Sequence, residues 1–375
     1  MGNTFDAVIV GAGVMGLGIG WRAARLGLSV LVLDRDRPGR GTSRVAAGML
    51  APVTEATFGE ERLLALTLES ARRFPTFLEE LADATGCELP TGAPGTLFVA
   101  VDRDQLEALR RLYEFQVGLG LPVEWLNGQR CRGLEPALHP GLRAGILAPG
   151  HEVDPRALTR ALASAVVSAG GRLRSGARVI ALTCDRGRVT GVRLAGGEEI
   201  PATRVVVAAG CWSAEVEGVP ESLARALRPV KGQILRLAPR RGDALPLTHL
   251  VRTEEVYLVP RRQGELVVGA TFEEQGFDTS LTAGGIYELL RAGIEVAPAV
   301  RELELVEASA GLRPGTPDNA PLLGPAGPEG LVIATGHFRH GILLAPVTAD
   351  AIASLLAKDD VPEEIRPFSP DRFSG

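Results

Sequence analysis

The sequence has few cysteines and no long uninterrupted apolar run. Its four cysteines, Cys87, Cys131, Cys184 and Cys211, lie far apart and form no C-x-x-C pair. Neither a zinc knuckle nor a disulfide framework is therefore predicted, and we expect all four to be small buried hydrophobic residues. No run reaches the ~18 continuous apolar residues that a membrane span needs, and no basic leader precedes the first predicted strand. These absences favour a cytoplasmic protein in a reducing compartment.

The charge balance also excludes some classes of partner. The 375 residues carry a formal net charge of −5, and the pI is near 5.7. This balance gives no electrostatic reason to expect a nucleic acid or an anionic membrane as partner. With 45% hydrophobic and 23% charged residues, the composition is ordinary for a globular protein with a sizeable core.

The N-terminal region has the pattern of a strand, a glycine turn and a helix. Asp6–Val10 is an apolar run typical of a buried strand, and Gly11-x-Gly13-x-x-Gly16 follows it directly. Gly11 permits a tight turn, Gly13 lets the backbone approach a pyrophosphate, and Gly16 lets helix and strand pack closely. The N-terminus of the helix would offer free N–H groups to that anion. This pattern predicts a bound dinucleotide.

An acidic residue completes the pattern. Asp34 ends a second apolar strand about 20 residues beyond the glycines, where its carboxylate would accept hydrogen bonds from a ribose diol. A carboxylate disfavours a 2′-phosphate, so NADP is not expected. On the residues alone, FAD and NAD both remain open.

The segment 35–52 is rich in glycine, arginine and small residues. Small residues would let a planar ring system lie against the backbone. A flexible loop is an equally good interpretation of the same composition.

Later segments predict a return to the first sheet and a second sheet. Ala202–Gly210 has the pattern of a buried parallel strand ending in small residues, which would bring its carboxyl end close to the same cofactor. A second, antiparallel sheet, covered by a helix over Gly285–Val296, is predicted from four extended segments: Arg228–Leu237, Val256–Pro260, Glu265–Thr271 and Arg301–Ala308.

The predicted fold class is an α/β dinucleotide-binding, Rossmann-like domain, which the resemblance described below identifies as an FAD domain, plus an α+β substrate domain with an antiparallel sheet. We expect five segments, which alternate between the two domains. The dinucleotide-binding domain would comprise residues 1–86, 149–225 and 311–375, and the substrate domain 87–148 and 226–310.

Seven motifs resemble the FAD-dependent amine oxidases of the D-amino-acid oxidase family, and within it the glycine oxidase (ThiO) type. They run in the family's order across nearly the whole chain. They are Gly11 to Gly16 with Asp34, Ala46–Leu50, Val205–Ser213, Pro229–Gln233, Tyr257–Arg261 before Val268–Thr271, Gly311–Thr316 and Gly336–Pro346.

This resemblance implies non-covalent FAD and oxidation of a small primary or secondary amine with O2, giving imine or oxo acid, ammonia and H2O2. It also implies a contribution to thiazole synthesis for thiamine, and a tendency to form homo-oligomers. The implied cofactor contacts are Val14 and Met15 at the phosphates, Asp34 and Arg35 at the ribose, Val179 at the adenine, Thr42, Ser43, Ala47, Gly48 and Met49 on the flavin side, Gly210 at the strand end, and His337, Phe338, Arg339, His340, Gly341, Ile342 and Leu343 around the flavin ring.

For the substrate, the resemblance implies that Arg313 pairs with the carboxylate, with Tyr257 and Arg339 lining the same pocket. A bidentate arginine–carboxylate pair would supply the orientation that transfer of a hydride from Cα requires. We expect Arg313 to be held stiffly by a turn between Gly311 and Pro314-Gly315. For His337 and His340, a hydrogen-bonding role beside the flavin is favoured over general base catalysis.

Three rival functions remain. A D-amino-acid dehydrogenase or sarcosine-type oxidase would use a different electron acceptor or amine. A non-enzymatic FAD-binding subunit would be yellow but unreactive, and an NAD-dependent dehydrogenase would be colourless. No metal site is predicted, because the histidines have no metal-ligand spacing.

Overall fold

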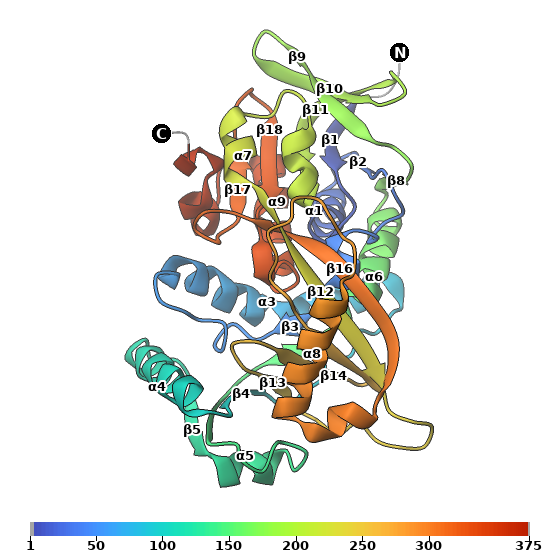
Figure 1. Cartoon of the computed structure of the whole chain (residues 1–375). Coiled ribbons are helices and arrows are strands. Elements are labelled where there is room, and N and C mark those ends of the chain that lie inside the picture. Colours follow the sequence, from blue (N-terminus) through green and yellow to red (C-terminus); the bar gives the residue numbers. More distant parts are fainter. Residues whose placement is uncertain (1–3, 374–375) are drawn as a thin grey trace.

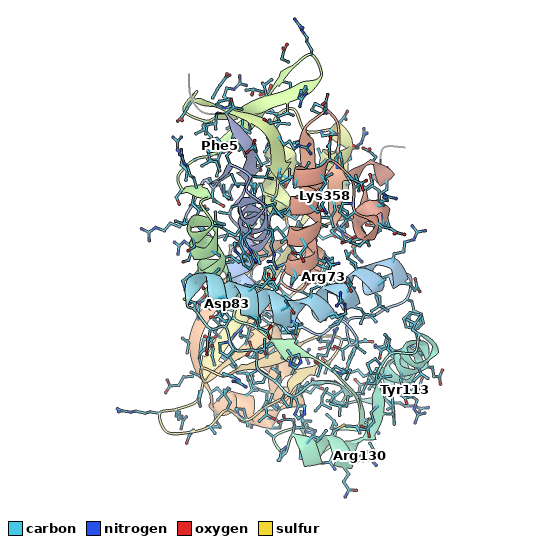
Figure 2. All side chains as sticks on the ribbon, turned by 180° about the vertical axis from the view of Figure 1, so that it is seen from behind. Phe5, Arg73, Asp83, Tyr113, Arg130 and Lys358 are labelled. Carbon is cyan, nitrogen blue, oxygen red and sulfur yellow. The ribbon has the colours of Figure 1, made fainter. Side chains whose placement is uncertain are left out.

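The computed structural model describes residues 4–373, which form two eight-stranded sheets joined by helices. In Figure 1 the first sheet lies in the upper half and the second in the lower half. The two termini of the described chain lie beside the first sheet. The long helix α3 (Glu61–Thr85) crosses between the halves, and Figure 2 shows it from behind with Arg73 and Asp83.

The first sheet has the order β17-β18-β11-β1-β2-β8, with β10 and then β9 added beside β11. Strands β18, β11, β1, β2 and β8 run parallel to one another. Strand β17 pairs antiparallel with β18, and β10 pairs antiparallel with both β11 and β9. The bounds are β1 Phe5–Val10, β2 Val30–Leu33, β8 Arg172–Arg174, β9 Val179–Asp185, β10 Arg188–Leu194, β11 Glu199–Val207, β17 Leu322–Pro325 and β18 Leu331–Thr335.

Alternate residues of β1 face opposite layers of the core, as the period of a strand requires. Ala7 and Ile9 join the core beneath the helices α1 (Val14–Arg25), α6 (Pro155–Ser168) and α9 (Ala345–Lys358). Val8 and Val10 join a second core under the β9–β10 hairpin and α7 (Glu221–Ala226). The sheet is therefore covered on both faces, which explains why its central strands are apolar throughout.

The second sheet has the order β16-β12-β15-β14-β13-β4-β6-β5 and is antiparallel except for the parallel pair β13 and β4. Helix α8 (Ala283–Val296) packs on it. The strand bounds are β4 Thr96–Ala100, β5 Glu124–Asn127, β6 Ala144–Ala148, β12 Arg228–Ala238, β13 Leu250–Arg252, β14 Tyr257–Arg261, β15 Glu265–Gly269 and β16 Glu304–Gly315.

Short elements complete the chain. Strands β3 (Met49–Leu50) and β7 (His151–Glu152) pair with each other. The remaining helices are α2 Thr42–Val45, α4 Arg103–Gly118, α5 Gly128–Leu134 and the 3-10 helices η1 Gly210–Glu215, η2 Pro298–Glu302, η3 Phe338–His340, η4 Glu363–Phe368 and η5 Pro370–Phe373.

The predicted fold class is confirmed, but three local predictions are wrong. Residues 298–302 form a 3-10 helix, and the strand predicted from Arg301 begins at Glu304. Arg313 lies within β16 rather than in a turn, because β16 pairs with β12 along its whole length up to Gly315. Cys131 and Cys211 are buried as expected, whereas Cys87 and Cys184 are exposed.

The five-segment division stays a prediction. Strands of the first sheet come from residues 5–33, 172–207 and 322–335, and those of the second from 96–148 and 228–315. Strand β16 therefore extends beyond the predicted boundary at residue 310, and this extension carries Arg313 into the second sheet.

Candidate functional site

A cavity of about 520 Å³ lies where the carboxyl ends of β1, β2, β11 and β18 meet the second sheet. Binding at the carboxyl ends of parallel strands is the general rule for open α/β sheets. All of the predicted site residues line this cavity except Gly16: Gly11, Gly13, Val14, Met15, Asp34, Arg35, Thr42, Ser43, Ala47, Gly48, Met49, Val179, Gly210, Tyr257, Arg313, His337, Phe338, Arg339, His340, Gly341, Ile342 and Leu343.

The glycine turn at the start of α1 leaves no room for side chains. Gly11 has a φ of +106°, and a Cβ at this position would lie 2.6 Å from the carbonyl oxygen of Ala208. A Cβ at Gly16 would lie 1.8 Å from the carbonyl oxygen of Gly11. Gly16 thus serves packing rather than the cavity wall, and Gly11 and Gly13 keep the turn free of side chains where it lines the cavity.

Asp34 is tied to the same turn. Its carboxylate accepts hydrogen bonds from the N–H of Ala12 at 2.7 Å and from that of Asp36 at 2.8 Å. Burial raises the pKa of the carboxyl, and the two backbone donors oppose this rise. The position of the acid at the cavity wall fits the ribose of a dinucleotide.

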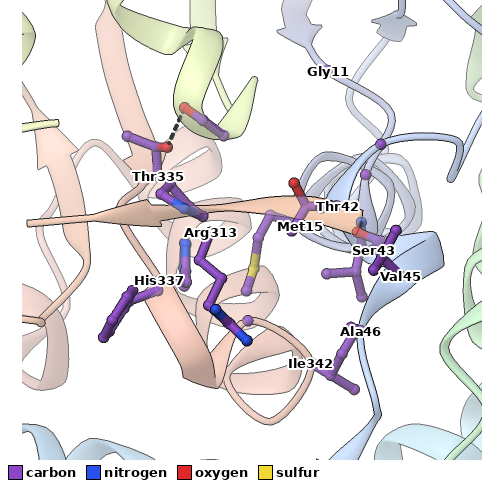
Figure 3. A pocket seen from close by; sticks show the side chains of 18 of the residues that line it. Gly11, Met15, Thr42, Ser43, Val45, Ala46, Arg313, Thr335, His337 and Ile342 are labelled. Atoms are coloured by element: carbon purple, nitrogen blue, oxygen red, sulfur yellow. Dashed lines mark hydrogen bonds between the residues drawn. The ribbon is translucent and has the colours of Figure 1, made fainter. Parts of the chain in front are cut away.

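Segment 42–49 forms the wall between the glycine turn and the second sheet. Thr42 donates its hydroxyl hydrogen to the carbonyl of Leu312 at 2.6 Å, and Ser43 accepts a hydrogen bond from the N–H of Val14 at 3.1 Å. Figure 3 shows Thr42, Ser43, Val45 and Ala46 following one another along this wall. The segment contains the short helix α2 and the start of β3 and lines the cavity, as the interpretation of its small residues as a wall for a planar ring expects.

Arg313 and Tyr257 form the far end of the cavity, and each side chain lies on a glycine backbone. A Cβ at Gly232 would be 2.5 Å from the Arg313 guanidinium, and a Cβ at Gly269 would be 2.4 Å from the Tyr257 hydroxyl. In Figure 3 the Arg313 side chain extends from β16 into the space between His337 and Ile342. Both polar groups thus reach the cavity because glycines on the neighbouring strands leave room.

The guanidinium of Arg313 has no acidic partner within 4.0 Å among residues 4–373, and its NH1 donates to the carbonyl of Thr271 at 3.2 Å. Burial raises the pKa of the Tyr257 phenol, and the nearby Arg313 charge opposes this rise. At neutral pH the end wall therefore offers a cation and a neutral hydroxyl donor, which are the groups that a carboxylate binds.

Arg339 is engaged differently, although it lines the same cavity. Its Nε lies 3.3 Å from Glu55, and its NH2 donates to Glu60. Arg252 also pairs with Glu55. Burial favours the neutral form of Glu55, but the charges of Arg252 and Arg339 prevail and lower its pKa, so Glu55 is a carboxylate at neutral pH.

His337 and His340 are both buried beside the cavity. Burial lowers the pKa of His337 to about 3 and that of His340 to about 4, so both rings are neutral at pH 7. The Nε2 atom of His337 lies 3.1 Å from the Thr348 hydroxyl. With pKa values this far below 7, both rings are weak bases, which agrees with the expected role beside the flavin better than with general base catalysis.

Sequence reasoning missed several residues of the cavity wall, including Glu55, Trp212, Arg252, Glu254 and Phe272. Glu55 is one of 45 acidic residues and lies in no motif, so no local signal marks it. Phe272 follows the Val268–Thr271 motif directly. Its ring contacts that of Phe338 edge to face at the cavity wall, with centroids 6.1 Å apart.

Two negative findings apply to residues 4–373. No group of three or more His, Cys, Asp or Glu side chains is placed to hold a metal ion. No helix in this part of the chain has the length and apolarity to cross a bilayer.

The family model described as FAD dependent oxidoreductase matches residues 6–355. The chain belongs to this family. It is 33% identical over 380 residues to a glycine oxidase of Geobacillus kaustophilus, covering 100% of this chain and 99% of that protein. The crystal structure of glycine oxidase from Geobacillus kaustophilus has a TM-score of 0.91 and 31% identity and covers 99% of both chains.

A second relative is longer. The bifunctional protein ThiO/ThiG of Trichormus variabilis is 34% identical over 373 residues, which cover 99% of this chain and 55% of that protein. These matches make the chain an FAD-dependent oxidoreductase of the amino-acid oxidase type and exclude an NAD-dependent dehydrogenase.

The cavity fits the cofactor of the family. A dinucleotide pyrophosphate needs bare backbone at the first turn, and Gly13, which lines the cavity, supplies it, whereas Gly11 allows the tight turn against Ala208. FAD also needs a ribose acceptor and a wall for the ring, and Asp34 and segment 42–49 provide them in the same cavity.

Proposed function

We propose that this protein oxidises glycine or another small amino acid, such as sarcosine or D-alanine, at the Cα–N bond. The observation that carries the proposal is the end wall of the cavity. Arg313 presents a guanidinium without an acidic partner within 4.0 Å among residues 4–373, and Tyr257 presents a hydroxyl beside it. A small amino acid bound there by its carboxylate would place its Cα next to the part of the cavity that would hold FAD.

Each residue would have a defined task. Arg313 would bind the substrate carboxylate through two parallel N–H···O bonds, and Tyr257 would donate a third hydrogen bond to it. This anchoring restricts rotation of the substrate and holds Cα in one position, which is the main contribution that such a site must make. Arg339, which pairs with Glu55 and Glu60, would shape the pocket rather than bind the carboxylate.

Bound FAD would supply the redox chemistry, as a two-electron acceptor for the Cα–H hydride that passes electrons on to O2 to give H2O2. No residue of the pocket needs to act as a base if the amine is bound in its neutral form. The imine would leave the site and hydrolyse to an oxo acid and ammonia, or be used in thiazole synthesis for thiamine.

The remaining parts of the proposal rest on the sequence. We expect FAD to be held without a covalent bond, so that acid precipitation of the protein should release it. We also expect a cytoplasmic location, a homo-oligomer, and contacts to FAD from the cavity residues named above. The alternation of FAD-binding and substrate segments belongs to the same proposal.

The proposal is tested by anaerobic titration of the purified yellow protein with glycine, sarcosine and D-alanine. Bleaching of the flavin absorbance by at least one of them, followed by H2O2 formation under air, is the expected result. Rapid turnover with an artificial dye and little peroxide would favour a dehydrogenase. A yellow protein that none of the three bleaches would contradict the proposal and favour a non-enzymatic FAD-binding subunit.

A further inference from the structure

The wall segment Arg44–Met49 is held from outside the cavity by two arginines, the half-buried Arg156 and the buried Arg261. Arg156 of α6 donates from Nε to the carbonyl of Arg44 at 3.1 Å, and its NH1 donates to Glu307 of β16 at 3.0 Å. Arg261 of β14 donates from NH2 to the carbonyl of Ala47. Both arginines contact the backbone of the segment, and neither lines the cavity.

Arg261 also pairs with Glu152, which itself contacts the same segment through the backbone. Its NH1 donates to Glu152 at 2.6 Å, and the exposed fractions of the two side chains are 1% and 3%. Glu152 belongs to β7, where its backbone pairs with Met49, and the neighbouring N–H of Val153 donates to the carbonyl of Gly48 at 3.0 Å. The carbonyl of Ala47 and the backbone of Met49 are thus fixed to one buried ion pair.

The segment has backbone donors that remain available to a ligand. Within residues 4–373, the N–H groups of Ala47 and Gly48 have no hydrogen-bond acceptor, although both residues are buried and line the cavity. A buried N–H without a partner is costly, so a site that retains two of them usually has a ligand to accept them. The flavin ring carries oxygen and nitrogen acceptors along one edge.

We propose that Arg261 is a positioning residue for FAD: together with Glu152 it fixes the backbone of Ala47–Met49 so that its free N–H groups meet the flavin. Arg261 stands on the second sheet, whereas the glycine turn belongs to the first. The contact therefore couples the sheet that carries Arg313 and Tyr257 to the wall that receives the ring. This inference depends on the FAD dependence of the family and not on the identity of the amine.

A purely structural role for Arg261 can be separated from a positioning role, because the sheet contains a matched arginine. Arg236 of β12 is also buried, with a side chain 3% exposed, and it pairs with Glu265 at 2.5 Å. It makes no hydrogen bond to segment 44–49, and two of its nitrogen atoms have no partner among the described residues. Burying either guanidinium has a desolvation cost, but of the two arginines only Arg261 forms a hydrogen bond with the backbone of the cavity wall.

The experiment compares Arg261→Met, Arg261→Lys and Arg236→Met in the full chain. FAD is removed, and the dissociation constant for added FAD is measured by the loss of its fluorescence, together with the melting temperature of each apoprotein. A charge-assisted hydrogen bond to the wall predicts that FAD binds about 10- to 100-fold more weakly to Arg261→Met than to the unchanged protein. The visible absorbance bands of the bound flavin should also shift in this variant.

The control variants decide the interpretation. Arg236→Met should lower the melting temperature while leaving the FAD dissociation constant within about twofold of the unchanged value. Arg261→Lys retains the charge beside Glu152 but has a single, compact donor group, so it should fold normally and still bind FAD more weakly. It replaces Arg261→Met in the comparison if that variant fails to fold.

Two results would overturn the proposal. One is an Arg261→Lys protein that binds FAD as tightly as the unchanged protein with the same absorbance bands. The other is an Arg236→Met protein that loses as much FAD affinity as the Arg261 variants, since the effect would then follow from the loss of any buried arginine.

Discussion

The two ends of the cavity are built in different ways. The dinucleotide end consists of one continuous strand, turn and helix, and the glycine turn that joins them lines the cavity. The substrate end is assembled from side chains of distant strands, among them Tyr257 of β14 and Arg313 of β16. Local geometry determines the first end, and long-range packing determines the second, so the two ends should respond differently to substitution.

The largest effect is expected for Gly11→Ala at the dinucleotide end. The new Cβ would lie 2.6 Å from the carbonyl oxygen of Ala208 at a φ of +106°. Backbone strain alone should weaken FAD binding on the order of 100-fold, and the collision adds to it. Absorbance of the purified protein at the flavin bands measures the loss.

Gly27→Ala is the control for this prediction. Gly27 has a φ of +87°, but a Cβ there would meet nothing within 4 Å. Gly27 does not line the cavity, so this variant has backbone strain away from the FAD site and no collision, and it should remain yellow. A yellow Gly11→Ala protein would show that the turn tolerates a side chain.

At the substrate end, Arg339→Met should reduce stability more than substrate affinity. The change leaves Glu60 without its guanidinium partner and Glu55 with only Arg252, which should lower the free energy of unfolding by about 2–3 kcal/mol. Urea unfolding of the flavin-loaded protein measures this loss. If Arg339 instead binds the substrate carboxylate, glycine affinity will fall as steeply as in an Arg313 variant.

Because its histidines are buried, the substrate end should make the free energy of unfolding fall at acidic pH. Burial lowers the pKa of His340 from 6.5 to about 4. Between pH 6.5 and pH 4, the imidazole is therefore protonated in the unfolded chain but neutral in the folded protein. Stability is therefore retained above pH 6.5 and lost as the pH falls toward 4. This residue alone should remove about 2 kcal/mol between pH 7 and pH 5.

His340→Asn should make the fall in unfolding free energy between these pH values shallower by that amount, as measured by urea unfolding. An unchanged slope would mean that His340 is already protonated or exposed in the folded protein.

The smallest effect is expected for Asp34→Asn. Both carboxylate oxygens already accept hydrogen bonds from the backbone, at 2.7 and 2.8 Å, and an amide can keep only one of these contacts. We expect FAD affinity to fall by about 1 kcal/mol, measured by titration of the apoprotein. A complete loss of FAD would mean that the acid, and not the glycine turn, dominates the dinucleotide end.

The same difference between the ends explains what could be predicted from the sequence. The glycine turn, β1, β2 and Asp34 follow from local patterns, and the prediction of an FAD oxidoreductase fold is confirmed by the family match. The position of Arg313 could not be predicted, because a local glycine–proline pattern indicates a turn. Pairing with β12, more than 70 residues earlier, makes it a strand instead.

The charged network behind the substrate end left no signal in the sequence. Arg252 and Glu55 are 197 residues apart in the chain, and Arg261 and Ala47 are 214 residues apart. Such pairs depend on the packing of two sheets, and neither periodicity nor spacing reveals them. The motifs around Tyr257, Arg313 and Arg339 drew attention to this end, but not to the pairs that these residues and their neighbours form.

The most direct test of the central claim is anaerobic stopped-flow reduction of Arg313→Met by glycine, compared with the unchanged protein. If Arg313 holds the carboxylate, the glycine dissociation constant should rise on the order of 30-fold or more, while the FAD content stays the same. A dissociation constant within about twofold of the unchanged value would show that the substrate is held elsewhere, and the proposed mechanism would be wrong.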